Sequence, residues 1–149
     1  MPLIVQKYGG TSVGSIERID HVADIVAQES QKNQVAVVVS AMTGETNRLI
    51  ALAQGLCKEP NRLALDMILA SGEQVSCGLL AIALEKRGLR ALPMLAFQAG
   101  IKTNEIFSDA RIESINSDFL RKNLDKGIIP IVAGFQGVYE DEDRFEYIT

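Results

Sequence analysis

Short runs of apolar residues alternate along the chain with longer segments in which apolar positions recur every three or four residues. The short runs predict strands at residues 2–8, 35–39, 90–95 and 128–133. Four of the five residues at 35–39 are valine, which predicts a strand in a parallel sheet that is covered on both faces. The alternation therefore predicts a layered α/β domain with right-handed crossovers.

Helical periodicity predicts helices at residues 15–31, in the segment after Gly44, and at residues 61–70, 71–87 and 117–127. In the first helix the inward face is expected to comprise Ile16, Ile19, Val22, Ala23 and Val26. In the second it is expected to comprise Leu49, Ile50, Leu52, Ala53 and Leu56. The segments at 61–70 and 71–87 form either two helices or one helix with a break at Gly72. Ser71 and Gln74 have the spacing of a capping box, which favours a helix that begins at Ser71.

In the last third of the chain the residue pattern predicts shorter strands and turns. Residues 98–112 are rich in polar and turn-forming residues and predict short antiparallel strands, whereas residues 136–149 predict a hairpin with an acidic turn at 140–143. Pro130 is unexpected inside a strand, because proline cannot donate a hydrogen bond to a neighbouring strand.

Composition limits the possible partners. With 149 residues, 47% of them hydrophobic, the chain can bury one core and reads as a single domain. A net charge of −4 speaks against nucleic acid and anionic membrane surfaces. No apolar run approaches the length of a membrane span and no signal-peptide pattern is visible, so we expect a cytoplasmic protein. Cys57 and Cys77 are expected to be free, buried thiols, and the single His21 gives little basis for a metal site or a catalytic triad.

The end of the first strand carries the most distinctive chemistry. Lys7 and Tyr8 precede the pair Gly9-Gly10, and a turn rich in hydroxyl groups then leads into a helix. Glycines let a ligand approach the backbone, and free N–H groups near a helix N-terminus attract anions. A glycine pair alone is most often only a turn, but the lysine and the long helix behind it favour a phosphate site. The spacing fits neither the dinucleotide fingerprint nor the Walker loop.

Ligands of parallel sheets bind at the carboxyl ends of the strands. Residues 7–12, 40–46 and 134–137 follow three of the predicted strands, so they are expected on one rim.

Five segments in this order resemble the amino-acid kinase family and, within it, the aspartokinases. They are Lys7–Gly14, Val39–Met42 with Thr46, Ser71–Gln74, Gln98–Gly100 with Asp109–Ile112, and Val132–Gly137. The resemblance implies a three-layer α/β/α sandwich with a mainly parallel central sheet. It also implies transfer of the γ-phosphoryl group of ATP, with magnesium, to the side-chain carboxylate of L-aspartate, the first step toward lysine, threonine and methionine.

The resemblance also implies roles for individual residues. Lys7 would neutralise charge on the transferring phosphoryl group, and Tyr8, Gly9, Gly10 and Ser40 would lie on the nucleotide side. Glu73 would bind the ammonium group of aspartate, with Thr46 and Ser12 as further contacts. No residue is assigned as a metal ligand.

Each role has a plainer alternative. Glu73 could be an acid in the first turn of a helix, and Thr46 could be the N-cap of its helix. Arg111 stays outside the site, and the acidic residues 140–143 are expected to form a solvated turn, not a magnesium site. The whole chain could instead be a related kinase acting on acetylglutamate or uridylate, or a non-catalytic folding or interaction unit. Lys7 with its motif and the Ser71–Gln74 segment speak against the related kinases.

The family continues past Thr149 into an Arg-Gly-Gly-Ser-Asp segment that supplies an arginine and an aspartate to the site. We therefore expect residues 1–149 to be the substrate-side, N-terminal portion of a catalytic domain, without the nucleotide-binding half and the regulatory domains, and to be inactive alone. An exposed sheet edge would favour a homo-oligomer.

Overall fold

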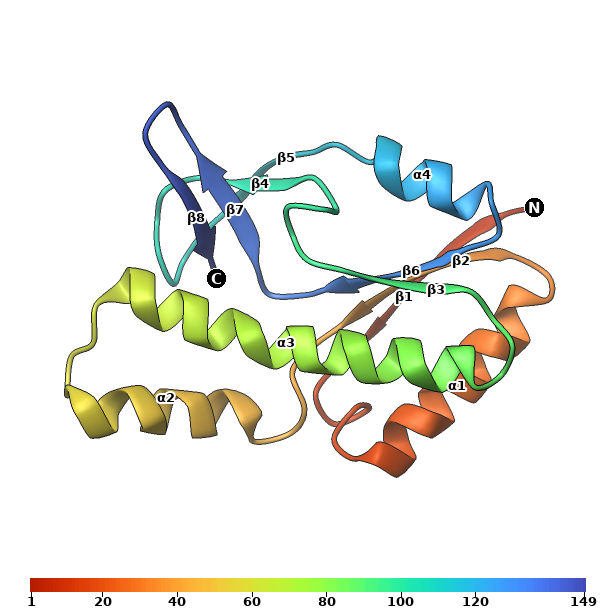
Figure 1. Ribbon diagram of the computed structural model, residues 1–149, viewed down its shortest axis with the longest axis horizontal. Coiled ribbons are helices and arrows are strands. Elements are labelled where there is room, and N and C mark those ends of the chain that lie inside the picture. The colour runs from red at the N-terminus through yellow and green to blue at the C-terminus, as the bar shows by residue number, and fades with distance from the viewer.

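A computed structural model describes residues 1–149 and shows a parallel sheet with a smaller mixed sheet beside it (Figure 1). The parallel sheet has the strand order β1-β2-β6-β3. Its strands are β1 (Leu3–Tyr8), β2 (Gln34–Val39), β6 (Ile129–Ala133) and β3 (Ala91–Met94). All their pairings are parallel, so the four apolar runs form one parallel sheet as predicted.

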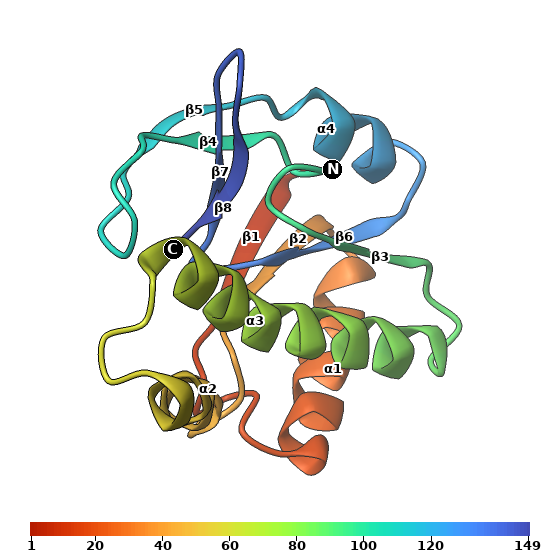
Figure 2. The ribbon, with the colours of Figure 1, turned by 60° about the vertical axis from the view of Figure 1, so that its left-hand side comes forward.

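Helices cover both faces of this sheet (Figure 2). The helices are α1 (Ile16–Ser30), α2 (Glu45–Leu56), α3 (Arg62–Glu85) and α4 (Asp118–Leu124). The main core lies where α1 and α3 pack on the sheet, and its 16 buried residues come from α1, α3, β2 and β6, with Val13 added from the turn before α1. The short α4 lies on the other face, where Leu120 packs against a small cluster around Met94 and Val132. The three-layer α/β/α architecture is therefore confirmed.

Burial of the strands is uneven. All five residues of β6 are buried, but in β2 the burial alternates, with Val35, Val37 and Val39 buried and the residues between them only half-buried. Strand β2 is thus covered on both faces as predicted, but the cover is incomplete on the face of α4 (Figure 2). The reason is that α4 has only 7 residues, against 15 in α1 and 24 in α3, and shields less of its face.

Pro130 has no N–H group, but it lies at a position of β6 where this costs no hydrogen bond to a neighbouring strand. The N–H of Ile129 donates to Arg90 O beside β3, and the N–H of Gly134 donates to Val39 O beside β2. Because successive N–H groups point to opposite sides, the nitrogen of Pro130 faces β2. The β2–β6 pairing begins only at the next residue, so Pro130 interrupts no bond inside that ladder.

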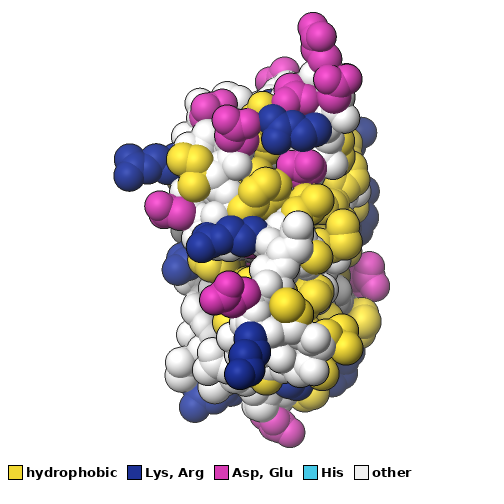
Figure 3. Space-filling view, turned by 90° about the vertical axis from the view of Figure 1, so that its left-hand side faces the viewer, with side chains coloured by type: hydrophobic (Ala, Val, Ile, Leu, Met, Phe, Trp, Pro, Cys, Tyr) yellow, Lys and Arg dark blue, Asp and Glu magenta, His cyan; other side chains and the backbone are white.

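The second sheet has the order β5-β4-β7-β8, with β4 (Ile101–Thr103), β5 (Ile112–Ile115), β7 (Gly137–Glu140) and β8 (Phe145–Ile148). The pair β7–β8 is the predicted hairpin, and β4–β5 is antiparallel as predicted, although β5 begins only at Ile112, where the predicted segment ends. The acidic turn is closed by Asp141, which accepts the N–H groups of Asp143 and Arg144 at 2.9 Å each. Figure 3 shows acidic side chains at the top, where this turn projects into solvent.

Helix α3 is one unbroken helix, and the predicted start at Ser71 is wrong. The Ser71 hydroxyl donates to Ile68 O at 2.6 Å inside the helix, so it caps nothing. By length and composition alone α3 could also cross a membrane, contrary to the expectation that no segment approaches that length, but 56% of that window is buried inside the protein. This core position explains its apolar composition.

Several local expectations also need correction. Ile16, Leu52 and Leu56 are exposed, because α1 and α2 each bury a narrower face than their periodicity predicted. Gly44, with φ of 79°, is the N-cap of α2, so Thr46 is not. Both cysteines are free as expected, but only Cys77 is buried and Cys57 is exposed.

Candidate functional site

A concavity of about 410 Å³ lies beyond the carboxyl ends of β1 and β2, beside α3. Its lining comes from the turn after β1, the loop after β2, the middle of α3 and the loop after β6, and comprises Gly10, Thr11, Ser40, Ala41, Met42, Thr43, Gly44, Thr46, Glu73 and Phe135. Four residues assigned from the sequence, Gly10, Ser40, Thr46 and Glu73, are thus brought together from separate segments.

The turn after β1 packs tightly against the loop after β2. Thr43 Oγ1 donates to Gly10 O at 2.9 Å, and a Cβ atom at Gly10 would lie 2.9 Å from Ala41 O. Only glycine therefore fits at position 10 without displacing the backbone of the other loop. At Gly9, by contrast, no other group lies within 4 Å of a built Cβ, so this glycine borders open space.

This turn offers backbone donors. The carbonyl of Gly9 accepts the N–H groups of Ser12 and Val13, whereas the N–H groups of Gly9, Gly10 and Thr11 donate to no other protein group. At the start of α1, Ser15 Oγ accepts Arg18 N at 3.3 Å. The turn therefore has free N–H groups for an anion.

Glu73 is the most unusual group of the concavity. It lies in the middle of α3, so it is not a first-turn acid, and only 3% of it is exposed. Its Oε1 accepts Ala41 N at 3.2 Å, while Oε2 is buried without a partner. Burial raises the pKa of this carboxyl, and hydrogen bonds from backbone N–H groups lower it in part. A buried carboxylate with a free oxygen is suited to a cationic group of a ligand.

The remaining assigned residues do not line the concavity. Lys7 is exposed at the end of β1 and is paired with Val38, on the sheet face opposite α1 and α3. The Tyr8 hydroxyl donates to Gln6 Oε1 at 3.0 Å, its ring packs on the main core and its carbonyl accepts Ser40 N at 3.0 Å, so neither its side chain nor its carbonyl is free for a ligand. Burial, followed by the charge of Glu29, raises the pKa of Tyr8. Ser12 is exposed in the turn.

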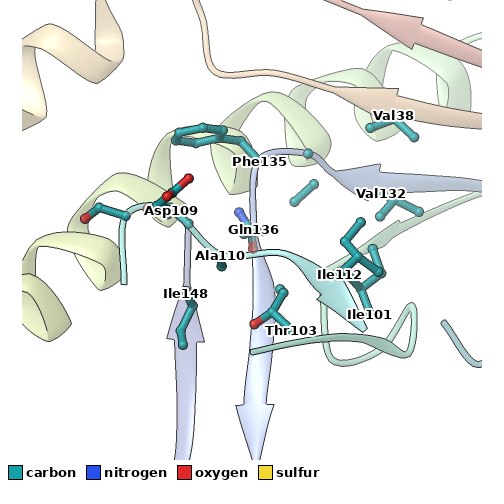
Figure 4. A pocket seen from close by; sticks show the side chains of 15 residues that line it. Val38, Ile101, Thr103, Asp109, Ala110, Ile112, Val132, Phe135, Gln136 and Ile148 are labelled. Atoms are coloured by element: carbon teal, nitrogen blue, oxygen red, sulfur yellow. The ribbon is translucent and has the colours of Figure 1, made fainter. Parts of the chain in front are cut away.

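A second cavity, of about 450 Å³, adjoins the concavity on the side of the second sheet (Figure 4). Phe135 lines both, with φ of 58° and the aromatic ring exposed. Thr103 Oγ1 and Gln136 Oε1 are buried here without partners, while Gln136 Nε2 donates to Ala70 O at 3.0 Å. Sequence reasoning placed residues 134–137 on the rim but singled out none of these side chains.

Asp66 is a structural group that sequence reasoning missed. It is fully buried, and its carboxylate accepts Ser108 N at 3.0 Å, Ser108 Oγ at 2.9 Å and Thr149 N at 2.9 Å. Asp66 thereby joins α3 to the loop after β4 and to the end of β8. A signal was present, because Asp66 and Glu73 are seven residues apart and share one helical face with the buried Leu69 and Ala70.

No group of three or more His, Cys, Asp or Glu side chains in the chain could hold a metal ion. In the hairpin turn, Asp141 is engaged by Arg144, which also pairs with Glu105 of the loop after β4, at 2.9 Å each.

Comparison with known proteins places these features among relatives. The family model described as amino acid kinase family matches residues 2–148. The chain is 52% identical over 141 residues to the aspartokinase of Geobacillus stearothermophilus and 49% identical over 142 residues to aspartokinase 2 of Bacillus subtilis (strain 168). These matches cover 94% and 95% of this chain but 35% of each relative, so the chain spans about a third of their length.

Solved structures of aspartate kinases contain the fold of this chain. All of the chain superposes on 24% of the aspartate kinase from Synechocystis, with a TM-score of 0.81 and 39% identity. It also superposes on 43% of E. coli aspartokinase III in complex with aspartate and ADP, with a TM-score of 0.85. At 21% identity the second match shows the shared fold alone.

Proposed function

Because the chain belongs to the amino acid kinase family, we propose that it forms the aspartate-binding side of an aspartokinase. Such an enzyme transfers the γ-phosphoryl group of ATP to the side-chain carboxylate of L-aspartate. The names of relatives that are 52% and 49% identical to the chain support this activity. The observation that carries the proposal is the buried Glu73, whose Oε2 lacks a partner beside a concavity.

On the substrate side, Glu73 binds the ammonium group of L-aspartate. A buried, unpaired carboxylate is costly, and an ammonium group at hydrogen-bond distance from Oε2 offsets that cost. Thr46 lines the same concavity, and its hydroxyl group is the second contact to aspartate. Ser12 is retained as a contact from the turn after β1.

On the phosphate side, the free N–H groups of Gly9 and Gly10 bind phosphoryl oxygens, with Ser40 and Tyr8 beside them. An oxygen of the aspartate carboxylate attacks the γ-phosphorus, and the bond from that phosphorus to the bridging oxygen of ADP breaks. The protein contributes positioning and balancing charge. Lys7 supplies one positive charge for the oxygens of the transferring group.

ATP and magnesium belong to this proposal, and the chain holds no group of three or more His, Cys, Asp or Glu side chains that could bind a metal ion. Magnesium is commonly held by substrate phosphates and water with one or two carboxylates. We therefore assign no step to a metal held by this chain. A cytoplasmic location is likewise proposed, supported by two free cysteines.

Binding of L-aspartate to the chain tests the proposal by NMR titration at pH 7.5. We expect a dissociation constant on the order of 1 mM, because only part of the relatives' length is present. N-acetyl-L-aspartate, which lacks the ammonium group, should not bind. Glu73→Gln should weaken binding by at least about 10-fold, whereas Glu17→Gln, on the exposed first turn of α1, should leave it unchanged. Equal binding of both ligands, or full affinity in Glu73→Gln, would show that Glu73 is not the ammonium site.

A further inference from the structure

The second cavity, beside the second sheet, holds an unusual set of buried polar atoms. Thr103 Oγ1, Gln136 Oε1 and Thr149 Oγ1 belong to residues that line it, and none of the three atoms has a hydrogen-bond partner in the protein. Each of these residues is at most 9% exposed. A buried polar atom without a partner costs free energy, so most such atoms in proteins bond to another group, to water or to a ligand. Three of them at one cavity indicate a ligand site.

The rest of the fold holds these three residues in place. Gln136 Nε2 donates to a carbonyl of α3 at 3.0 Å, so Oε1 is the end of the amide that remains available, and it can only accept. Thr103 packs its Cγ2 so closely on Gly137 that a Cβ atom there would collide with it, which restrains the threonine side chain. The N–H of Thr149 donates to the buried Asp66 at 2.9 Å. The polar atoms are therefore preorganised.

The remaining wall of the second cavity is largely aliphatic (Figure 4). Its larger apolar side chains come from β2, β4, β5, β6 and β8, and are Val38, Ile101, Ile112, Val132 and Ile148. The cavity volume is about 450 Å³. Sites for small molecules commonly have this size and combine apolar walls with a few fixed polar groups. A branched aliphatic body therefore fits the wall.

The charges around the second cavity limit the head of the ligand. No Lys, Arg or His lines it, and its one acid, Asp109, is exposed at the rim. An anion would meet the acceptor oxygen of Gln136 without a cation to balance it, and a buried cation would find no buried carboxylate. An uncharged head with both a donor and an acceptor satisfies all three groups, because it donates to Gln136 Oε1 and accepts from the threonine hydroxyls. Primary amides and alcohols have such heads.

We propose that the second cavity binds a small neutral molecule with an amide or hydroxyl head and a branched aliphatic body. The head contacts Gln136 Oε1 and the hydroxyls of Thr103 and Thr149, and the body packs on the aliphatic wall. This chemistry differs from that of the neighbouring concavity, where free N–H groups and the carboxylate of Glu73 suit a charged ligand. The inference is independent of the proposed catalytic function.

NMR titration of the methyl-labelled chain with isobutyramide at pH 7.5 tests the proposal. We expect a dissociation constant on the order of 1–10 mM, since the probe has few atoms. The largest shifts should fall on the methyl groups of Ile101, Val132 and Ile148. Isobutyrate and isobutylammonium keep the body but carry a charge, so each should bind at least about 10-fold more weakly. Acetamide lacks two carbons of the body and should bind about 10-fold more weakly.

Three variants locate the site. Thr103→Val replaces the hydroxyl by a methyl group of similar size and should weaken isobutyramide binding about 5- to 10-fold. It should not lower stability in urea, because the hydroxyl has no partner in the protein. Ala110→Leu fills the cavity from its lining and should abolish the shifts. Ser114→Ala, which removes an exposed hydroxyl of β5, is the matched control and should bind as the parent chain does.

Four results would each overturn the proposal. They are the absence of shifts at about 100 mM isobutyramide, equal binding of isobutyramide and isobutyrate, shifts centred on the concavity around Glu73, and full affinity in Thr103→Val. Thr103→Val is decisive even where Ala110→Leu fails to fold, because it changes one atom of a side chain and keeps its shape.

Discussion

Glu73 Oε1 accepts the N–H of Ala41 at 3.2 Å, which links the middle of α3 to the loop after β2. This bond orients the carboxylate, and the other oxygen remains buried without a partner. Further hydrogen bonds join other segments to α3. Gln136 Nε2 donates to Ala70 O, and the backbone N–H groups of Ser108 and Thr149 donate to the carboxylate of Asp66. One face of a single helix therefore holds three loops of the site in place.

The buried charge of Glu73 should lower stability at neutral pH. Burial raises its pKa above the ordinary value of 4.5, so the folded chain holds this proton more tightly than the unfolded chain. The resulting stabilisation is present below the ordinary pKa and is lost as pH rises through the raised pKa. Glu73→Gln should therefore increase the free energy of unfolding at pH 7 by about 1 kcal/mol. Urea denaturation of both proteins at pH 4 and pH 7 measures the change in the free energy of unfolding. An equal effect of Glu73→Gln at both pH values would contradict the prediction.

Gly10→Ala should destabilise the chain because its Cβ would meet Ala41 O at 2.9 Å. The expected loss is about 1–3 kcal/mol in urea denaturation, the usual cost of overpacking. Gly55→Ala is the matched control, since Gly55 lies in α2 with open space around a built Cβ. That change should stabilise the chain by about 0.5–1 kcal/mol, because alanine is the better helix former. Equal effects of the two substitutions would show that the contact between the loops is loose.

Asp66→Ala should cost about 2–4 kcal/mol, because it removes a buried carboxylate that accepts three hydrogen bonds. Asp66→Asn should recover more than half of this loss, since an amide oxygen can accept both backbone N–H groups. Hydrogen exchange should show the N–H groups of Ser108 and Thr149 exposed in the alanine variant and protected in the asparagine variant. Unchanged protection in Asp66→Ala would mean that other contacts hold these segments.

The two cysteines should differ in reactivity toward a thiol reagent. Burial, followed by the charge of Glu73, raises the pKa of Cys77 to about 12, whereas Cys57 is exposed. Because the thiolate is the reactive form, only Cys57 should be alkylated by iodoacetamide at pH 8 in the folded chain. Mass spectrometry should find one added group on the native chain, none on Cys57→Ser, and two on the unfolded chain. Modification of native Cys77 would show that α3 separates from the sheet under these conditions.

The order of strands and helices could be read from the sequence, because burial in a layered domain requires apolar residues at a period of two, in continuous runs, or at a period near 3.6. The rim of the site could be predicted for the same reason: residues 7–12, 40–46 and 134–137 follow strands that lie side by side. Pro130 looked inconsistent with a strand, since only the register with β2 shows where its missing donor falls.

Tertiary packing decided the rest. Ser71-Gly72-Glu73-Gln74 has the local pattern of a helix start, but packing of α3 against the sheet and α1 continues one helix through it and turns an apparent first-turn acid into a buried carboxylate. Local propensity amounts to less than about 1 kcal/mol per residue, and burial of a long apolar face outweighs it. The partners of Asp66 lie 42 and 83 positions away, so only the folded chain could bring them together. The sequence by itself determined which elements form and which strand ends meet; the tertiary structure decided which polar side chains are buried there and which of them remain free for a ligand.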